Sequence, residues 1–199
     1  MSNTGKIKVV GLCGLAGSGK TTAAKALEGY GFTRLPFAGP LKDMCRSILS
    51  LREMAGDLKE TPRKRLGGKS PRQFMQLLGT EFGRDLIGPN FWVDLWLESV
   101  GEAGLEALAA NLDGALVVAD DVRFPNEAAA VHSLGGLVIR IERAGAGSST
   151  GAGHPSEALD FEPDLVVRNV GSEEDFTEAI ADAIADYAWA ENISRLAEG

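Results

Sequence analysis

The stretch Val9–Leu27, VVGLCGLAGSGKTTAAKAL, places four glycines in a largely apolar run. Within it, Gly14–Thr21 (GLAGSGKT) matches the spacing G-x-x-x-x-G-K-[ST]. The β-branched run 7–12 before the motif predicts a buried strand, and the alanine-rich segment from about Lys20 predicts a helix. In this context the glycines let successive backbone N–H groups converge on a phosphate at the positive end of the helix. The stretch therefore predicts a nucleoside triphosphate site, with ATP as the expected nucleotide.

The motif also assigns roles to its side chains. We expect Lys20 to reach the β- and γ-phosphates of ATP and the Thr21 hydroxyl to bind Mg²⁺. The chain has no [NT]-K-x-D motif of the kind that reads guanine, and it is short for an ATP-driven motor domain. These observations favour a small-molecule kinase. The expected ATP-binding residues are Gly14, Leu15, Ala16, Gly17, Ser18, Gly19, Lys20, Thr21 and Thr22.

Composition narrows the class of protein further. The chain has 199 residues, 44% hydrophobic and 24% charged, so we expect one globular domain over 1–199. A net charge of −8 argues against general affinity for nucleic acid or an anionic membrane surface. With no apolar run of about 18 residues and no signal-peptide pattern, we expect a cytoplasmic protein, in the host cytoplasm if phage-encoded. The expected partners are small-molecule substrates, and the chain itself is expected to be a monomer or a homodimer.

Apolar strand patterns alternate with helical patterns along the whole chain. Short strands are predicted at 33–35, 114–121, 137–142 and 164–170. Helices are predicted from Pro40 to Ile48, from Pro71 with Ser70 as its cap, from Phe91 and from Pro125, and Gly79 and Gly83 can interrupt the second of them. Ser172 and Asp175 are expected to cap a last helix. The alternation predicts an α/β fold, a P-loop NTPase three-layer sandwich with a parallel sheet of about five strands.

A kinase that transfers phosphate between two phosphate-bearing molecules needs particular residue types in the rest of its site. A phosphate monoester has a second pKa near 6 and is already nucleophilic at neutral pH, so such an acceptor needs no carboxylate base. Two polyanions must however be brought together, and arginine holds phosphate oxygens bidentately. Candidate arginines beside predicted loops or element ends are Arg72, Arg84, Arg123, Arg140 and Arg143.

Four segments behind the P-loop carry a family resemblance. FAGPLK (37–42), SPRQFMQLLGTEFGRDLIGPNFWVDLW (70–96), VVADDVRFPNEA (117–128) and HPSE (154–157) resemble the phage-type deoxynucleoside monophosphate kinases. The resemblance implies an adenylate-kinase-like fold: a P-loop core, a helical monophosphate-binding region at about 37–110 and a small lid at about 142–158. It also implies transfer of the γ-phosphate of ATP to a deoxynucleoside monophosphate.

The resemblance and the candidate arginines together give the expected site. Lys20, Arg123 and Arg143 are the expected catalytic residues, Arg140 is expected to bind ATP, and Asp120 is expected to join Thr21 at the metal. Asp120 and Asp121 end a strand. Successive strand residues point to opposite faces, so one of the two acids is expected to face the P-loop, and both remain candidates.

Trp92 and Trp96 are expected in the core, and the cation-rich run 59–69 is expected to be a solvated segment. The expected acceptor-binding residues are Phe37, Lys42, Arg72, Gln73, Phe74, Arg84, Asp121, Arg123, His154 and Glu157.

Two alternatives share these features. One is a P-loop kinase for another phosphorylated acceptor, such as dephospho-coenzyme A or phosphomevalonate. The other is a nucleotide-gated binding protein that hydrolyses ATP slowly and transfers phosphate to no monophosphate. Product analysis with each acceptor distinguishes all three functions.

Overall fold

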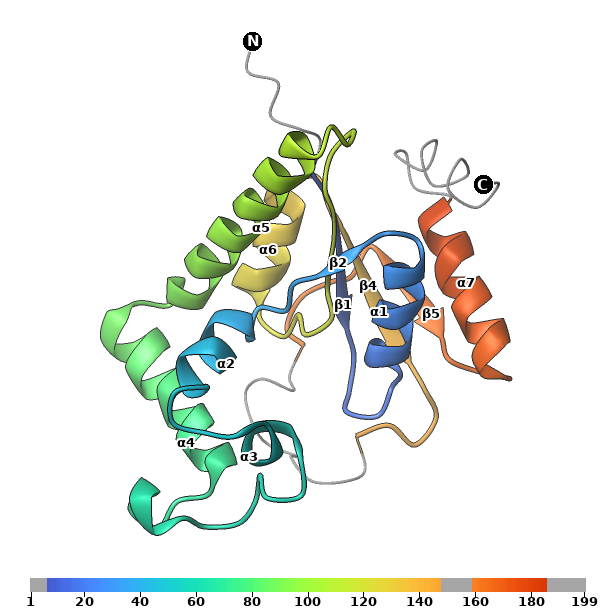
Figure 1. The fold of residues 1–199 in the computed structure, drawn as a ribbon. Coiled ribbons are helices and arrows are strands. Elements are labelled where there is room, and N and C mark those ends of the chain that lie inside the picture. Colours follow the sequence, from blue (N-terminus) through green and yellow to red (C-terminus); the bar gives the residue numbers. More distant parts are fainter. Residues whose placement is uncertain (1–6, 148–158, 186–199) are drawn as a thin grey trace. The chain divides into compact units, whose positions relative to one another are not determined.

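A computed structural model describes residues 7–147 and 159–185 of the chain (Figure 1). These residues divide into two compact units. Those up to Pro36 and those from Ser99 onward form one unit, here called the sheet unit. Phe37–Glu98 form the other, here called the helical unit. Each unit is described by itself.

The sheet unit is built on five parallel strands. Their order is β2-β3-β1-β4-β5, and every neighbouring pair is parallel, which confirms the predicted α/β fold class. Because all five carboxyl ends meet at one edge, the loops that follow the strands gather there. The strands are β1 (Lys8–Cys13), β2 (Thr33–Arg34), β3 (Leu116–Ala119), β4 (Leu137–Glu142) and β5 (Leu165–Arg168).

Helices cover both faces of this sheet. α1 (Lys20–Gly29) and α7 (Glu173–Ala185) pack against each other on one face, and α6 (Pro125–Ser133) packs against β1 and β4 on the other (Figure 1). Side chains alternate between the faces as the strand period requires. The buried core on the α1 and α7 side includes Val10, Leu12, Leu27, Ile139, Phe176 and Ile180.

The last helix begins as its sequence predicts. The Ser172 backbone N–H donates to Asp175 Oδ2 over 2.8 Å, and the Asp175 N–H donates to Ser172 Oγ over 3.1 Å. This reciprocal pair satisfies N–H groups that the first helical turn leaves without partners. The predicted cap of α7 is confirmed.

The helical unit contains short helices joined by tight turns. They are α2 (Gly39–Cys45), α3 (Leu51–Ala55), the 3₁₀ turn η1 (Lys64–Leu66), α4 (Pro71–Leu77), the π-helix η2 (Leu78–Ile87) and the start of α5 (Phe91–Ala109). The predicted Ser70 cap of α4 is confirmed, since Ser70 Oγ accepts from the Gln73 N–H. No helix within the two described ranges is long and apolar enough to cross a membrane.

One helix of this unit is shorter than predicted, and another is not predicted at all. The apolar pattern from Pro40 runs to Ile48, but α2 ends at Cys45 and Ile48 is exposed. The Ser47 hydroxyl donates to the Met44 carbonyl, which competes with continuation of the helix. Ser50 then caps α3, with Glu53 at the third position. The Ser-x-x-Glu spacing of Ser50 and Glu53 is the sequence pattern that could have predicted the start of α3.

Candidate active site

The P-loop joins β1 to α1 at the carboxyl edge of the sheet. At Gly14 the φ angle is +140°, and an added Cβ would lie 2.4 Å from the Ile141 carbonyl oxygen, so only glycine fits there. Asn169, directly after β5, donates from Nδ2 to the Ser18 carbonyl over 2.8 Å. The Gly147 N–H donates to the Ala16 carbonyl over 2.9 Å. Segments that follow β4 and β5 thus hold the loop in its curled conformation.

Lys20 lies over this loop. Its Nζ donates to the carbonyls of Gly14 and Leu15 over 2.7 and 2.9 Å. Burial lowers the pKa of Lys20 below its ordinary value, and the nearby Arg123 charge lowers it further, while Asp120 and Asp121 act in the opposite direction. The ammonium group therefore lies within electrostatic reach of both strand-end acids and of Arg123.

Asp120 and Asp121 occupy the predicted position after β3, beside the end of β1. Asp120 is the more buried of the two, with 7% of its surface exposed. Arg34 on β2 donates from Nη2 to Asp120 Oδ2 and forms an ion pair with it. Within the described ranges no three His, Cys, Asp or Glu side chains come together as a metal site. A metal here would need other oxygen ligands besides Asp120.

Arg34 belongs to no motif, and the sequence does not predict it as a site residue. The sequence position of Arg34 indicates a site residue only once the strand order is known. β2 pairs with β3, and Arg34 is in register with Val118, two residues before Asp120. Asn169 has a simpler signal, because it lies near the end of the last predicted strand, 164–170, and directly follows β5 in the structure. Both residues lie at the edge where the carboxyl ends of the strands gather.

Arg123 lies in the connection 120–124 between β3 and α6. The buried Glu127 carboxylate accepts hydrogen bonds from the backbone N–H groups of Arg123 and Phe124, over 2.7 and 3.1 Å. The Val122 N–H donates to the Leu12 carbonyl of β1. These bonds fix the backbone of Arg123 next to the P-loop strand, and its side chain is exposed.

A cavity of about 620 Å³ opens beside the P-loop, within the sheet unit. Its walls come from the P-loop, from the end of β4 with the residues after it, and from β5 with the residues after it. A volume of this size is typical of small-molecule sites. Its lining includes Gly14, Leu15, Arg140, Arg143, Arg168 and Val170.

The two candidate arginines in this cavity differ in their contacts. Arg140 is half-buried on β4, and its Nη2 donates to the Phe161 carbonyl over 2.7 Å. Arg140 therefore ties the 159–161 segment to the sheet. Arg143 follows β4 and is exposed. His154, Glu157 and most of the predicted lid lie outside the described residues.

In the helical unit, the predicted acceptor residues fall into core and surface positions. Phe37 is 3% exposed and stacks on Trp96, with ring centroids 4.1 Å apart. Its ring thus belongs to the core in this structure, and the expected burial of Trp96 is confirmed. Phe74 is half-buried and Lys42 is exposed on α2. Phe74 is the aromatic candidate with surface left for an acceptor base.

Arg72 and Arg84 lie on one continuous helical segment, α4 and η2. Arg72 is in the first turn, where its Nε contacts Glu60, and Gln73 beside it is engaged in the cap with Ser70. Arg84 lies half-buried in η2. The two positions are twelve residues apart, which at the α-helical rise of about 1.5 Å per residue is at most about 18 Å along the axis. Because of this separation, we do not expect one phosphate to bind the guanidinium groups of both arginines.

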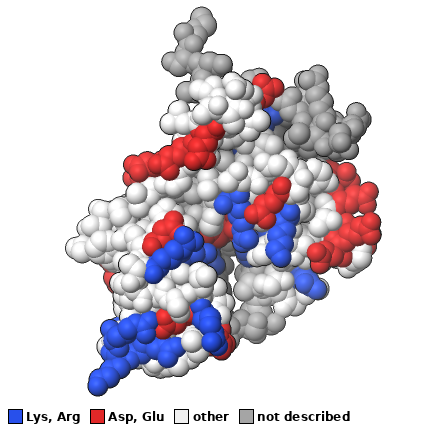
Figure 2. Space-filling model, viewed as in Figure 1, with Lys and Arg blue, Asp and Glu red and all other residues white. Residues whose placement is uncertain are grey.

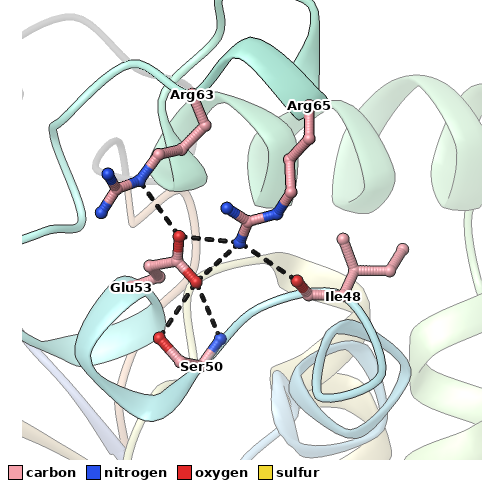
Figure 3. Close-up of polar contacts among 5 residues, drawn as sticks. All are labelled: Ile48, Ser50, Glu53, Arg63 and Arg65. Atoms are coloured by element: carbon pink, nitrogen blue, oxygen red, sulfur yellow. Dashed lines mark hydrogen bonds and ion pairs between the residues drawn. The ribbon is translucent and has the colours of Figure 1, made fainter.

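The cation-rich run 59–69 is more ordered than a solvated segment. Glu53 on α3 is 5% exposed, and both its oxygens lie 2.7 Å from Arg65 Nη2, while Arg63 Nε lies 3.1 Å from Oε1 (Figure 3). Glu53 Oε2 also accepts from the Ser50 N–H and hydroxyl, and Arg65 reaches the Ile48 carbonyl. The Arg65 guanidinium in particular lowers the pKa of Glu53 to about 2. Two of the cations therefore fold inward on one carboxylate.

The cations of this run still dominate their part of the surface. In Figure 2 the Lys and Arg side chains gather over the region of η1 and the start of α4. Acidic side chains gather instead over α7, which carries exposed Glu173, Glu174 and Glu178. On the face that Figure 2 shows, the Lys and Arg side chains thus gather most densely over the helical unit, and acidic side chains gather over α7.

Comparison with known proteins gives consistent results. The model of the family described as deoxynucleotide monophosphate kinase matches residues 57–180, a range that does not include the P-loop. A protein of Acanthamoeba polyphaga mimivirus named for the same activity is 38% identical over 157 residues, which cover 75% of this chain and 80% of that protein. The deoxynucleoside-5'-monophosphate kinase of Escherichia phage T5 is 32% identical over 94 residues, 45% of this chain and 34% of that longer protein.

Solved structures show a more distant likeness. TT1252 from Thermus thermophilus is 18% identical with a TM-score of 0.48, and 90% of this chain aligns with 97% of that one. A dephospho-CoA kinase from Campylobacter jejuni is 17% identical with a TM-score of 0.47, and 91% of this chain aligns with 97% of that one. At this level of similarity neither structure bears on the choice of acceptor.

Proposed function

The chain belongs to the deoxynucleotide monophosphate kinase family, and from that premise we propose how its residues transfer the γ-phosphate of ATP to a deoxynucleoside monophosphate. The observation that carries the proposal is the P-loop at the carboxyl edge of the parallel sheet, with Lys20, the two strand-end acids and Arg123 around it. We assign the donor nucleotide to the sheet unit and the acceptor to the helical unit, Phe37–Glu98.

ATP binds to the P-loop through its phosphates. The backbone N–H groups of the glycine-rich turn and the amino end of α1 supply partial positive charge where the phosphates lie. The adjoining cavity, with Leu15 and Val170 as apolar surface and Arg143 at its wall, suits the adenosine part of the nucleotide. Lys20 then exchanges its two carbonyl partners for phosphate oxygens.

The acceptor phosphate acts as the nucleophile without help from a base. Its second pKa is near 6, so at neutral pH it carries the required lone pair and charge. We assign Arg84 to its direct binding, because Arg84 is half-buried, where a charge interacts more strongly than in open water, whereas Arg72 is exposed. Phe74 is assigned to the base, and Lys42 and Gln73 to the surrounding polar contacts.

Transfer forms a bond between an acceptor oxygen and the γ-phosphorus and breaks the bond to the β-γ bridging oxygen, which leaves on ADP. The three γ-oxygens gain their strongest interactions with the protein as this happens. Lys20, Arg123 and Arg143 are the cations assigned to that charge. Asp121 is assigned to orient Arg123 or the acceptor.

Thr21 and Asp120 are the residues proposed to hold Mg²⁺, which neutralises phosphate charge when bound. Asp120 suits this role because it is a carboxylate at the end of the strand next to β1, and Arg34 engages one of its oxygens.

We propose that the active species is a monomer or a homodimer, which sedimentation velocity distinguishes. The cytoplasm, where both substrates occur, is the proposed site of action.

An acceptor screen tests the proposal. The purified chain is incubated with ATP and Mg²⁺ and, separately, with each of the four deoxynucleoside monophosphates, each ribonucleoside monophosphate and dephospho-coenzyme A. Products are separated by anion exchange, and Lys20→Ala serves as the control. We expect ADP and a deoxynucleoside diphosphate in equal amounts with at least one deoxynucleotide.

The rival functions give different products. Phosphorylated dephospho-coenzyme A, with no deoxynucleoside diphosphate, would assign the chain to another acceptor. ADP release that is independent of every acceptor would identify a slow ATPase. Removal of Mg²⁺ with a chelator is expected to stop transfer, and restoration by added Mg²⁺ excludes loss of the fold.

A further inference from the structure

The helix that carries Arg84 changes type before it reaches that residue. α4 is an α-helix to Leu77, and η2 continues it as a π-helix from Leu78. The Gly88 N–H donates to the Gly83 carbonyl over 3.0 Å, which is the i to i+5 spacing of a π-helix. Runs of π-helix are rare and often occur at functional sites. Some feature of the unit must therefore favour this register over the α-helical one.

Trp92 provides such a feature. Its indole Nε1 donates to the Gly79 carbonyl over 2.8 Å. Its ring lies against Gly83, where an added Cβ would fall 2.2 Å from Nε1 and 2.5 Å from Cε2. Trp92 is 4% exposed, and its ring also contacts the Phe91 ring edge to face, with ring centroids 4.7 Å apart. One buried side chain thus engages both glycines of the π-helix.

These contacts explain why the two glycines do not end the helix. The sequence suggests that Gly79 and Gly83 interrupt it, because glycine weakens helices. In the structure the Trp92 ring packs directly on the bare backbone of Gly83, and the Trp92 indole binds the Gly79 carbonyl. An α-helical register over the same residues would rotate Arg84 about the axis, since the two helix types hold different numbers of residues per turn.

We propose that Trp92 is a positioning residue that holds the π-helical register of η2 and thereby aims Arg84 at the acceptor phosphate. The inference rests on the proposed role of Arg84 in acceptor binding. The proposal requires that Trp92 does more than fill space in the core. Phenylalanine would retain an aromatic ring in the core but could not donate to the Gly79 carbonyl.

The test is a double-mutant cycle with Trp92→Phe, Arg84→Ala and the combined variant. For each, kcat and the KM values for ATP and a deoxynucleoside monophosphate are measured by steady-state kinetics. Trp92→Phe should raise the acceptor KM about tenfold, the loss expected for one directing hydrogen bond, with the ATP KM within about twofold of wild type. In the Arg84→Ala background the same change should add less than about twofold, because its effect acts through Arg84.

The outcomes separate this inference from the proposed function. If Arg84→Ala raises the acceptor KM but Trp92→Phe does not, Arg84 binds the acceptor and Trp92 does not position it. If Trp92→Phe has the same effect with and without Arg84, its role is general packing and the inference is wrong. If Arg84→Ala leaves the acceptor KM unchanged, the assigned acceptor site fails and the positioning role fails with it.

A glycine pair gives a second test that keeps Trp92 in place. Gly83→Ala places a methyl group against the Trp92 ring, whereas Gly101→Ala in α5 places one where no atom lies within 4 Å. Gly83→Ala should raise the acceptor KM about tenfold with the ATP KM retained, and Gly101→Ala should change neither. Equal acceptor KM values for the two variants would contradict the positioning role of Trp92, even if Trp92→Phe fails to fold.

Discussion

The two units hold their functional residues by different means. In the sheet unit, the P-loop is shaped mainly by backbone: glycine conformations, strand ends and hydrogen bonds to main-chain carbonyls such as that of Ser18. In the helical unit the corresponding contacts are made by side chains: Trp92 packs on Gly83 of the helix that carries Arg84, and Glu53 binds Arg63 and Arg65. The proposed donor site is thus shaped by the topology of the sheet, and the proposed acceptor site by a few buried contacts.

This difference predicts how each unit responds to mutation. Side-chain changes around the P-loop should leave the sheet intact and alter only ATP binding or the transfer step. Changes in the helical unit should couple acceptor binding to local stability. The following experiments test that contrast, from the largest expected effect to the smallest.

Lys20→Ala should lower kcat by about 100-fold or more, because we assign Lys20 to the charge that develops during transfer. Its fold should persist, since the contacts of Nζ with the residues that the structure describes are hydrogen bonds to two loop carbonyls. The measurement is kcat with both substrates saturating, with circular dichroism as the check on folding. A folded variant that retains more than about a hundredth of wild-type kcat would contradict the P-loop assignment.

Asn169→Ala should weaken ATP binding about tenfold, because it removes the donor that anchors the Ser18 carbonyl. The KM for the deoxynucleoside monophosphate should stay near its wild-type value. Asn169→Asp is the matched variant, since it keeps the size but replaces the N–H donor with an acceptor, and it should bind ATP no better than alanine. An unchanged ATP KM in both variants would show that the loop holds its shape without this bond.

Arg72→Ala should raise the acceptor KM only about two- to threefold, less than Arg84→Ala, because an exposed ion pair such as Arg72 with Glu60 contributes little. Glu60→Ala serves as its partner control and should reproduce the effect if Arg72 acts through that pair. A tenfold rise for Arg72→Ala with no rise for Arg84→Ala would exchange the two assignments.

Acid should weaken the helical unit through Glu53. Its pKa in the folded chain is about 2, against an ordinary value of 4.5, so its stabilising contacts are complete above about pH 5 and are lost as the pH falls towards 2. Glu53→Gln should lower the melting temperature at pH 7, and its difference from wild type should shrink between pH 5 and pH 2. The exposed Glu102→Gln should show no such convergence. A difference that stays constant with pH would mean that the charge of Glu53 is unimportant.

The sheet unit was the more predictable from sequence, for a physical reason. Strand and helix periods are local, and the P-loop spacing encodes both the loop and its neighbours, so the range 137–142 is predicted to the residue. Ser172 and Asp175 likewise encode their own cap. The pairing of Arg34 with Asp120 was not predictable, because it depends on β2 lying next to β3.

The helical unit was harder to predict because its contacts are not periodic. Gly79 and Gly83 suggest a helix break, and only the position of Trp92 shows that Gly83 is a packing surface and that the Gly79 carbonyl accepts a hydrogen bond. The cations of 59–69 suggest a solvated segment, and only the buried Glu53 shows that two of them point inward. The roles assigned to the site residues stay predictions in both units.

The most direct test of the division between donor and acceptor residues is the steady-state kinetics of Arg84→Ala, Arg123→Ala and Arg143→Ala, with both substrates varied. If Arg84 binds the acceptor in its ground state, its loss should raise the acceptor KM with the ATP KM near normal. If Arg123 and Arg143 meet the γ-phosphate during transfer, their loss should lower kcat with little change in either KM. The same modest effect in all three variants would contradict the account, because it would show that these arginines are surface charges.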